Sequence, residues 1–314
     1  MVVGLVAVLV GQYTLHAQQL PEYSNYMLNN YMINPAVAGT SSHFEAVSTN
    51  RYQWVGIVDA PRTNILSVNG PLSNDKMGVG GSIYTDIVGP TRRIGMNLSY
   101  AYHLQVTSGT VLSGGVSAGL LQFTVDGDKI QLRDPSDLVL TNDRQRMVRP
   151  DVGFGLLWYD LQKLWYVGVS IPQTLQSRVK FDNAVTDKTS NLHRHIYVNG
   201  GYKYYLSGNY AIEPSVLMKY SSPAPFQFNF GARFIYQDRM WIGAMYRSGD
   251  AFAALLGYEY QERFRFGYSY DFTTSNLRNY SDGTHELLIA FKFHNARNGN
   301  SASVSDEESE SESE

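Results

Sequence analysis

The pentapeptide GVSAG, residues 115–119, matches the G-x-S-x-G pattern of a serine nucleophile. In that pattern the serine needs a sharp turn between a strand and a helix, which lets its hydroxyl reach a base and an oxyanion hole. Here the pentapeptide lies within a segment of alternating apolar and polar residues, and no helical pattern follows it. The chain also has 28 glycines, so a chance match is easy. We therefore expect no catalysis at Ser117 and interpret the protein as a non-enzyme.

Two other groups of residues could bind metal ions. His193 and His195 would share one face of a strand, but a zinc site needs three or four ligands. Residues 126–148 carry five aspartates, and calcium prefers six to eight oxygen ligands. Their spacing matches no EF-hand, and basic residues of the same segment neutralise much of the charge. A solvated strand start and an exposed loop of mixed charge are the favoured interpretations. Since no P-loop or dinucleotide motif is present either, we expect neither a metal nor a cofactor.

Composition favours β structure and excludes a nucleic-acid partner. Aromatic residues make up 13% of the 314 residues, with 23 Tyr, and there is no Cys. Tyr and Gly richness at this length favours strands over helices. The net charge of -3 conceals an acidic end, because residues 306–314 carry six acids and no base. A nucleic-acid-binding protein would show a concentrated basic patch, which this chain lacks.

The N-terminus has the features of an export signal. Residues 2–10 form an apolar run of the length of a secretory signal core, and the small residue Ala17 precedes a cleavage point. The run is too short for a membrane helix, which needs about 20 apolar residues. We therefore expect residues 1–17 to be a signal peptide, with a buried first strand as the alternative.

From residue 43 onward, segments with strand-like alternation follow one another, with no helical period of useful length between them. About 14 such strands are predicted. Their bounds are 43–55, 62–72, 76–86, 92–106, 110–125, 149–160, 163–175, 194–206, 209–221, 226–237, 239–247, 251–261, 263–272 and 284–293.

The connections between these strands alternate in length. Some are short turns, as at 73–75 and 107–109, and those between them are longer, as at 126–148 and 176–193. Outer-membrane barrels alternate tight periplasmic turns with long extracellular loops, whereas the Greek-key connections of a sandwich mix lengths. The sequence therefore predicts an all-β fold, a transmembrane antiparallel β-barrel of outer-membrane type. An even number of strands places the N- and C-termini on the periplasmic side.

Residues 263–272 show what such strands present to their two sides. All even-numbered positions are aromatic, and the odd-numbered ones are Arg, Gly, Ser or Asp. Successive side chains of a strand point to opposite faces, so one face carries only rings. The alternating loop lengths place these rings against outer-membrane lipid and Asp271 in the lumen. Alternation alone does not distinguish lipid from a protein core, so a large soluble sandwich stays the structural alternative.

The chain divides into four parts on this interpretation. The signal peptide is followed by residues 18–42, rich in Tyr, Asn and Met, and then by the barrel, residues 43–293. Residues 294–314 have no apolar period and end in Ser/Glu repeats, a composition that cannot bury enough apolar surface to fold. We expect a disordered acidic tail, and a solvating tail without a partner is the favoured interpretation.

Several segments resemble the PorP/SprF family of outer-membrane proteins of the type IX secretion system. They are YMINPAVAG at 31–39, NRYQWVGIVDAP at 50–61, PSVLMKY at 214–220, YRSGDAFAALLGY at 246–258 and GYSYDFTTSNLRNYSDGTHEL at 267–287. The acidic tail departs from the family pattern, in which the chain usually ends near the last strand.

The resemblance implies a docking function in the outer membrane of a Gram-negative, Bacteroidetes-like bacterium. Family members are needed to export large type IX substrates, such as gliding adhesins, or to hold them at the cell surface. The implied partners are a secreted adhesin or its C-terminal domain, and other parts of the apparatus, including lipoproteins and the translocon. Two alternatives stay open, a passive channel or transporter for apolar solutes and a barrel enzyme.

The predicted topology gathers three of these motifs at strand ends that carry long loops, outside the cell. This rim is the predicted client-binding site. Its candidate residues are Trp54, Pro61, Arg247, Ser248, Asp250, Asp271, Arg278, His285 and Glu286. The motif before the first strand starts on the other side, and it either plugs the lumen or serves as a periplasmic lead-in. Its candidate residues are Asn34, Pro35, Ala36 and Gly39.

Overall fold

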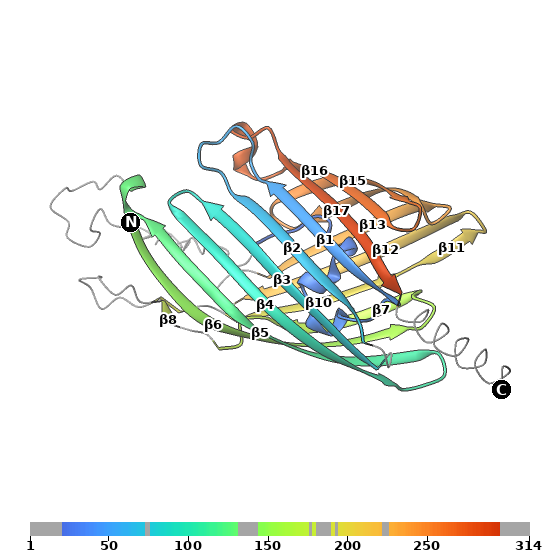
Figure 1. The fold of residues 1–314 in the computed structure, drawn as a ribbon. Coiled ribbons are helices and arrows are strands. Elements are labelled where there is room, and N and C mark those ends of the chain that lie inside the picture. The colour runs from blue at the N-terminus through green and yellow to red at the C-terminus, as the bar shows by residue number, and fades with distance from the viewer. Residues whose placement is uncertain are drawn as a thin grey trace, which may run out of the picture.

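The computed structural model describes residues 21–72, 76–130, 144–175, 178–179, 190–191, 194–221 and 226–295. Its main element is a closed antiparallel β-barrel of 14 strands (Figure 1). The predicted signal peptide, residues 1–17, lies outside the described residues. Of the predicted tail, residues 294–314, the first two belong to the last strand, and the rest lies outside the described residues.

The barrel strands follow the predicted segments closely. They are β1 (His43–Tyr52), β2 (Arg62–Pro71), β3 (Met77–Val88), β4 (Thr91–Gln105), β5 (Thr110–Asp126), β6 (Arg144–Asp160), β7 (Trp165–Ile171), β10 (His195–Tyr202), β11 (Tyr204–Ser207), β12 (Tyr210–Ser221), β13 (Gln227–Tyr236), β14 (Met240–Arg247), β15 (Ala251–Tyr260), β16 (Phe264–Thr273) and β17 (Thr284–Asn295). β10 and β11 form one barrel strand interrupted at Lys203, because both pair with β12. The prediction of about 14 strands in an antiparallel barrel is confirmed.

Neighbours in sequence are neighbours in the sheet, and the pairing of the first strand with the last closes the barrel. β1 pairs with β17, and β10 pairs with both β7 and β12. Two details differ from the sequence prediction. The expected loop at 87–91 is a turn of Gly89 and Pro90, because β3 and β4 pair as far as Val88 and Thr91. The connection between β7 and β10 contains a small two-stranded sheet, β8 (Arg178–Val179) with β9 (Ser190–Asn191).

The two ends of the barrel carry different connections. We call the end where β1 finishes and β17 begins the long-loop end, since residues 53–61 and 274–283 connect strands there. We call the other end, where β1 begins and β17 finishes, the short-turn end. Two of its hairpins have both central residues at positive φ, Gln237 and Asp238 at 51° and 54°, and Gln261 and Glu262 at 50° and 56°. Turns with two successive residues at positive φ match the right-handed twist of the strands they join.

The strands alternate between an apolar outer face and a polar inner face, as β16 illustrates. Phe266 and Phe272 are 42% and 55% exposed on the outside, whereas Ser269 and Asp271 are 0% and 1% exposed inside. The rings of this strand therefore face outward, as its alternation predicted. An outer surface of this kind is what a β-barrel presents to lipid.

Residues 21–42, which we call the inner segment, lie inside the barrel (Figure 1). They form three short 3₁₀ turns, η1 (Tyr26–Leu28), η2 (Asn30–Met32) and η3 (Pro35–Val37). Ser24 bonds to Glu286 at the long-loop end, and the segment joins β1 at the short-turn end. The first and last described residues thus lie at opposite ends of the barrel, while the expectation that both termini lie on one side stays a prediction. The N-terminus itself is outside the described residues.

Apolar contacts attach the inner segment to strands around the barrel. Tyr26 and Ile33 pack in one buried cluster with Leu217, and Leu28 packs in another with Trp241. Burial of such side chains stabilises a fold by roughly 1.5–3 kcal/mol each. Glycine allows the strands to approach the segment closely, because a Cβ at Gly115 would overlap the backbone of η3. The inner segment is therefore packed against the barrel wall at several places along its length.

Candidate functional site

Four buried charged side chains meet at the long-loop end of the lumen. Arg51 forms ion pairs with Asp271 at 2.8 Å and with Glu286 at 2.9 Å. Arg247 pairs with Asp271 at 3.1 Å, and none of the four side chains is more than 2% exposed. We call Arg51, Arg247, Asp271 and Glu286 the lumen ion cluster.

Strand register brings this cluster together. Arg51 of β1 lies directly opposite Glu286 of β17, and both point inward. Asp271 of β16 and Arg247 of β14 occupy inward positions near the long-loop ends of their strands. Cross-strand pairs of opposite charge stabilise a sheet, and here the pair of Arg51 and Glu286 shares one enclosed space with two further charges. The cluster therefore depends on the closed barrel, because its members come from both ends of the chain.

The lumen ion cluster holds the start of the inner segment. The hydroxyl of Ser24 donates to Asp271 at 2.7 Å and accepts from Arg51 and Arg247, each at 2.9 Å. The two oxygens of Glu286 accept from the backbone nitrogens of Ser24 and Asn25, each at 2.8 Å. Charge-assisted hydrogen bonds of this kind are about twice as strong as neutral ones. The cluster thus binds a backbone as well as balancing its own charges.

A further ion pair joins the inner segment to β12. Glu22 pairs with Lys219, and both side chains are 9% exposed. Burial by itself would raise the pKa of Glu22, but the nearby cations Lys219 and Arg247 outweigh it and hold that pKa below its ordinary value. The carboxylate of Glu22 is therefore ionised at neutral pH and is stabilised in that form by the lumen.

Two long loops form a joined surface above the cluster. The backbone nitrogen of Val55 donates to the carbonyl of Gly283 at 2.9 Å, and that of Asp282 donates to the carbonyl of Val55 at 2.7 Å. The backbone nitrogen of Trp54 donates to the hydroxyl of Thr284 at 3.1 Å. We call residues 53–61 and 274–283 the loop platform. These bonds link the two loops as a sheet ladder would, so the loop platform is ordered.

The loop platform presents apolar side chains to the outside. Val58 is 87% exposed and Tyr280 is 75% exposed. Trp54 and Asp59 hold positive φ angles of 47° and 56°, a conformation that costs free energy for residues other than glycine. Strained backbone and ordered, exposed apolar side chains recur at binding surfaces, which makes the loop platform the candidate contact surface.

The nine candidate rim residues divide between these two places. Asp250 borders the lumen ion cluster through its pair with Arg247 at 2.9 Å. Trp54 and Arg278 belong to the loop platform, and Arg278 is exposed. Pro61 is the last residue of the first platform loop. His285 lies just beyond the second loop, and its ring is hydrogen-bonded to the hydroxyl of Tyr268 at 2.7 Å. Ser248 accepts a hydrogen bond from the backbone of Phe228.

Four of the nine differ from the expectation of a surface rim. Pro61 is buried, and the other three are charged. Arg247, Asp271 and Glu286 are at most 1% exposed, so they are not open to a partner. The physical reason is the inner segment, which covers them and uses their hydrogen-bonding capacity through Ser24. Strand-end position was predicted correctly for these residues, but their exposure was not.

The candidate residues of the N-terminal motif lie inside the barrel. The side-chain amide of Asn34 donates to the carbonyl of Leu156 at 2.9 Å, and its oxygen accepts from the backbone of Ala36 at 2.9 Å. Pro35 begins η3, and Ala36 is 0% exposed. Gly39 has a φ of 78°, the left-handed region that glycine occupies readily. This motif shapes the turn that fits the inner segment against β6.

Three charged residues of the site were absent from the sequence prediction: Arg51, Lys219 and Glu22. Arg51 and Lys219 lie within segments that carried the family resemblance. A charged residue on the inward face at the long-loop end of a strand is the signal that could have found both. Glu22 precedes the first strand, and no pattern in its neighbourhood indicates its partner.

The enzyme and metal motifs find no supporting geometry in the described part of the chain. Ser117 lies in the middle of β5, so the required turn between strand and helix is missing there. His193 is outside the described residues, as is the middle of the aspartate-rich loop, residues 131–143. Among the described residues, no group of three or more His, Cys, Asp or Glu gathers to hold a metal ion.

The family assignment rests on a comparison of the whole chain. The family model described as type IX secretion system membrane protein PorP/SprF matches residues 15–291. The chain belongs to the PorP/SprF family. The resemblance of the five sequence segments is thereby confirmed, and PorP/SprF membership implies that the protein works with other components of the type IX secretion system.

Solved barrels similar to this PorP/SprF protein differ widely from it in sequence. The CymD monoaromatic hydrocarbon channel is 14% identical, with a TM-score of 0.48, over 85% of this chain and 93% of that one. A Pseudomonas aeruginosa FadL homologue is 13% identical, with a TM-score of 0.43, over 80% and 89%. The KdgM porin is 9% identical, with a TM-score of 0.41, over 80% and 99%. No curated protein matches the sequence.

No helix in the described part of the chain is long and apolar enough to cross a bilayer.

Proposed function

We propose that this PorP/SprF protein sits in the outer membrane of a Bacteroidetes-like bacterium and binds a large secreted client of the type IX system at its long-loop end. The client would be an adhesin of the gliding type, recognised through its C-terminal domain. Binding requires no bond chemistry, and the barrel acts as an anchor. On this proposal the long-loop end faces outside and the short-turn end faces the periplasm.

The observation that carries this proposal is the loop platform. Two loops distant in sequence are tied by backbone hydrogen bonds, and they expose Val58 and Tyr280 together. Exposed apolar side chains on an ordered loop lose little conformational entropy on binding, which favours a protein contact. Large aromatic side chains such as Tyr280 are also enriched among the residues that dominate binding energy.

The inner segment argues for anchoring over passage of solutes. A passive channel needs an open lumen, whereas residues 21–42 pack against strands around the interior. Ion conductance in planar bilayers separates the two functions. We expect the purified barrel to give no stable open-channel current at neutral pH. A steady current comparable to that of a porin would favour the channel.

The client-binding test uses affinity isolation from outer membranes and mass spectrometry of the proteins that co-purify. We expect one large surface protein in stoichiometric amount with the wild type. In the variant Val58→Asp with Tyr280→Ser, its recovery should fall at least about tenfold, because two exposed contact side chains are lost. The matched control is Leu161→Asp, an exposed apolar residue at 47% exposure on the short-turn end. Equal recovery with both variants would contradict docking on the loop platform.

A further inference from the structure

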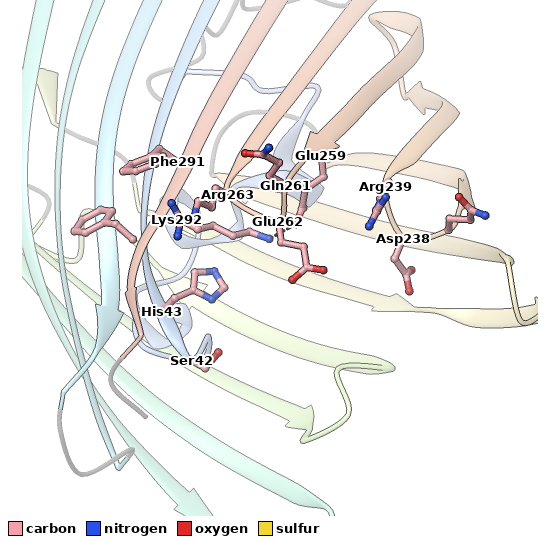
Figure 2. Close-up of a pocket in the computed structure, with 12 residues that line it drawn as sticks. Ser42, His43, Asp238, Arg239, Glu259, Gln261, Glu262, Arg263, Phe291 and Lys292 are labelled. Atoms are coloured by element: carbon pink, nitrogen blue, oxygen red, sulfur yellow. Dashed lines mark hydrogen bonds and ion pairs between the residues drawn. The ribbon is translucent and has the colours of Figure 1, made fainter. Parts of the chain in front are cut away.

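A hollow at the short-turn end is separate from the candidate client site. The cavity has a volume of about 920 Å³ and lies among the turns β13–β14 and β15–β16 and the joined ends of β1 and β17 (Figure 2). His43 and Lys292 line it, and they also line a second cavity of about 310 Å³ that reaches the inner segment. We call the larger hollow the vestibule.

Two arginines at equivalent positions of two similar turns line the vestibule. The sequence Tyr-Gln-Asp-Arg at 236–239 recurs as Tyr-Gln-Glu-Arg at 260–263. In both copies the two residues before the arginine have positive φ, and the arginine is the last residue before the next strand. Arg239 and Arg263 therefore occupy equivalent places on alternate hairpins, and both line the vestibule (Figure 2). Paired guanidinium groups suit carboxylates, which they bind in a bidentate manner.

The carboxylates of the vestibule are largely engaged with other cations. Asp238 pairs with Lys203 at 2.5 Å, and Glu259 pairs with Arg265 at 3.2 Å and also with Lys292. Within the part of the chain that the structure describes, neither Arg239 nor Arg263 forms an ion pair, and both are exposed. The lining then has two arginines and one remaining acid, Glu262. Its positive charge therefore exceeds the negative charge that is left to balance it.

The chain itself supplies an acidic segment, a short distance in sequence after the strand that ends at this opening. β17 ends at Asn295, opposite His43 on the edge of the vestibule. Residues 306–314 follow with six acids and no base. Glutamates occupy positions 308, 310, 312 and 314. In an extended chain these four share one face, because side chains alternate.

We propose that the acidic segment 306–314 binds across the vestibule of the same molecule, with its carboxylates paired to Arg239 and Arg263. The chain from 295 to 306 spans up to about 36 Å when extended, which is enough to return over the opening. Each exposed ion pair is weak in isolation, but a short tether raises the effective concentration of the tail to the millimolar range. This proposal is independent of client binding at the long-loop end.

Cross-linking in the full-length barrel tests the proposal, and the absence of native Cys leaves no background. The test pair is Ser42→Cys in the vestibule with Ser311→Cys in the tail. The control pair is Tyr280→Cys at the long-loop end with Ser311→Cys. We expect an intramolecular cross-link with the test pair and little with the control. The yield should fall roughly fivefold in Arg239→Gln with Arg263→Gln, and likewise in 1 M salt, where the Debye length is about 3 Å.

The matched charge control is Arg62→Gln with Arg92→Gln, two exposed arginines at the long-loop end. Its cross-link yield should equal that of the unsubstituted test pair. Equal yields for the test pair with and without Arg239 and Arg263 would overturn the proposal, as would equal yields for the test and control pairs. A product that migrates as a dimer would also overturn it, because the tail would then bind a second copy.

Discussion

The substitution Glu286→Gln would test whether the lumen ion cluster holds the inner segment. It keeps the size of the side chain but replaces one carboxylate oxygen with an amide, which donates hydrogen bonds. At present one oxygen accepts from the backbone of Asn25, and the other accepts from the backbone of Ser24 and from Arg51. In the variant, an amide nitrogen replaces one of these oxygens, so that it faces a hydrogen-bond donor without being able to accept from it. Arg51 also loses one of its two carboxylate partners.

The magnitude follows from burial. Removal of one partner of a buried ion pair costs roughly 3–5 kcal/mol, because the other charge stays enclosed. Arg51 keeps its contact with Asp271 at 2.8 Å, so part of its charge stays balanced. We therefore expect the lower end of that range, about 3 kcal/mol of unfolding free energy.

Urea unfolding of the refolded barrel in detergent, followed by tryptophan fluorescence, measures this change. Limited chymotrypsin digestion of the inner segment, which contains Tyr23, Tyr26 and Tyr31, gives a local readout. The matched control is Glu262→Gln, the same substitution at an exposed turn, with an expected effect within about 0.5 kcal/mol. If Glu286→Gln and Glu262→Gln unfold alike and resist digestion alike, the cluster does not hold the inner segment.

Two further outcomes are expected. The folded pKa of Glu22 lies below its ordinary 4.5. The stability that Glu22 contributes is therefore complete above that value and is lost as the pH falls through the folded pKa. The difference in urea midpoint between the wild type and Glu22→Gln should accordingly be present at pH 7 and shrink at pH 3, and a constant difference would contradict this. Gly115→Ala should destabilise the barrel by roughly 1–3 kcal/mol, because the new methyl group overlaps the backbone of Ala36. The control Gly208→Ala, where nothing lies within 4 Å, should change urea unfolding little, and equal effects would contradict the close packing of η3.

Local patterns were sufficient to predict the wall of the barrel. Each strand carries its own alternation, and β16 with its five rings at even positions is the clearest case. Short turns such as Gln261 and Glu262 end one run of alternation and start the next, so the boundaries were readable to within a few residues. The exception was β6, which begins at Arg144 inside a segment that the composition marked as a loop.

The candidate site was only partly predictable. The ends of β1, β14, β16 and β17 were placed together correctly, because antiparallel neighbours bring alternate strand ends to one side. The inner segment has no regular period, so its path could not be read from its residues. Without that path, nothing indicated that Ser24 would cover Arg247 and Asp271.

The sequence by itself determined the strands, their inward and outward faces and their two kinds of connection, because these follow from neighbours a few residues apart. Only the tertiary structure decided what fills the lumen and which charges are enclosed. Glu22 and Lys219 are 197 residues apart in the chain, and Ser24 and Glu286 are 262 apart. Such contacts exist only after the barrel has closed around the inner segment, since closure is what removes water from both partners.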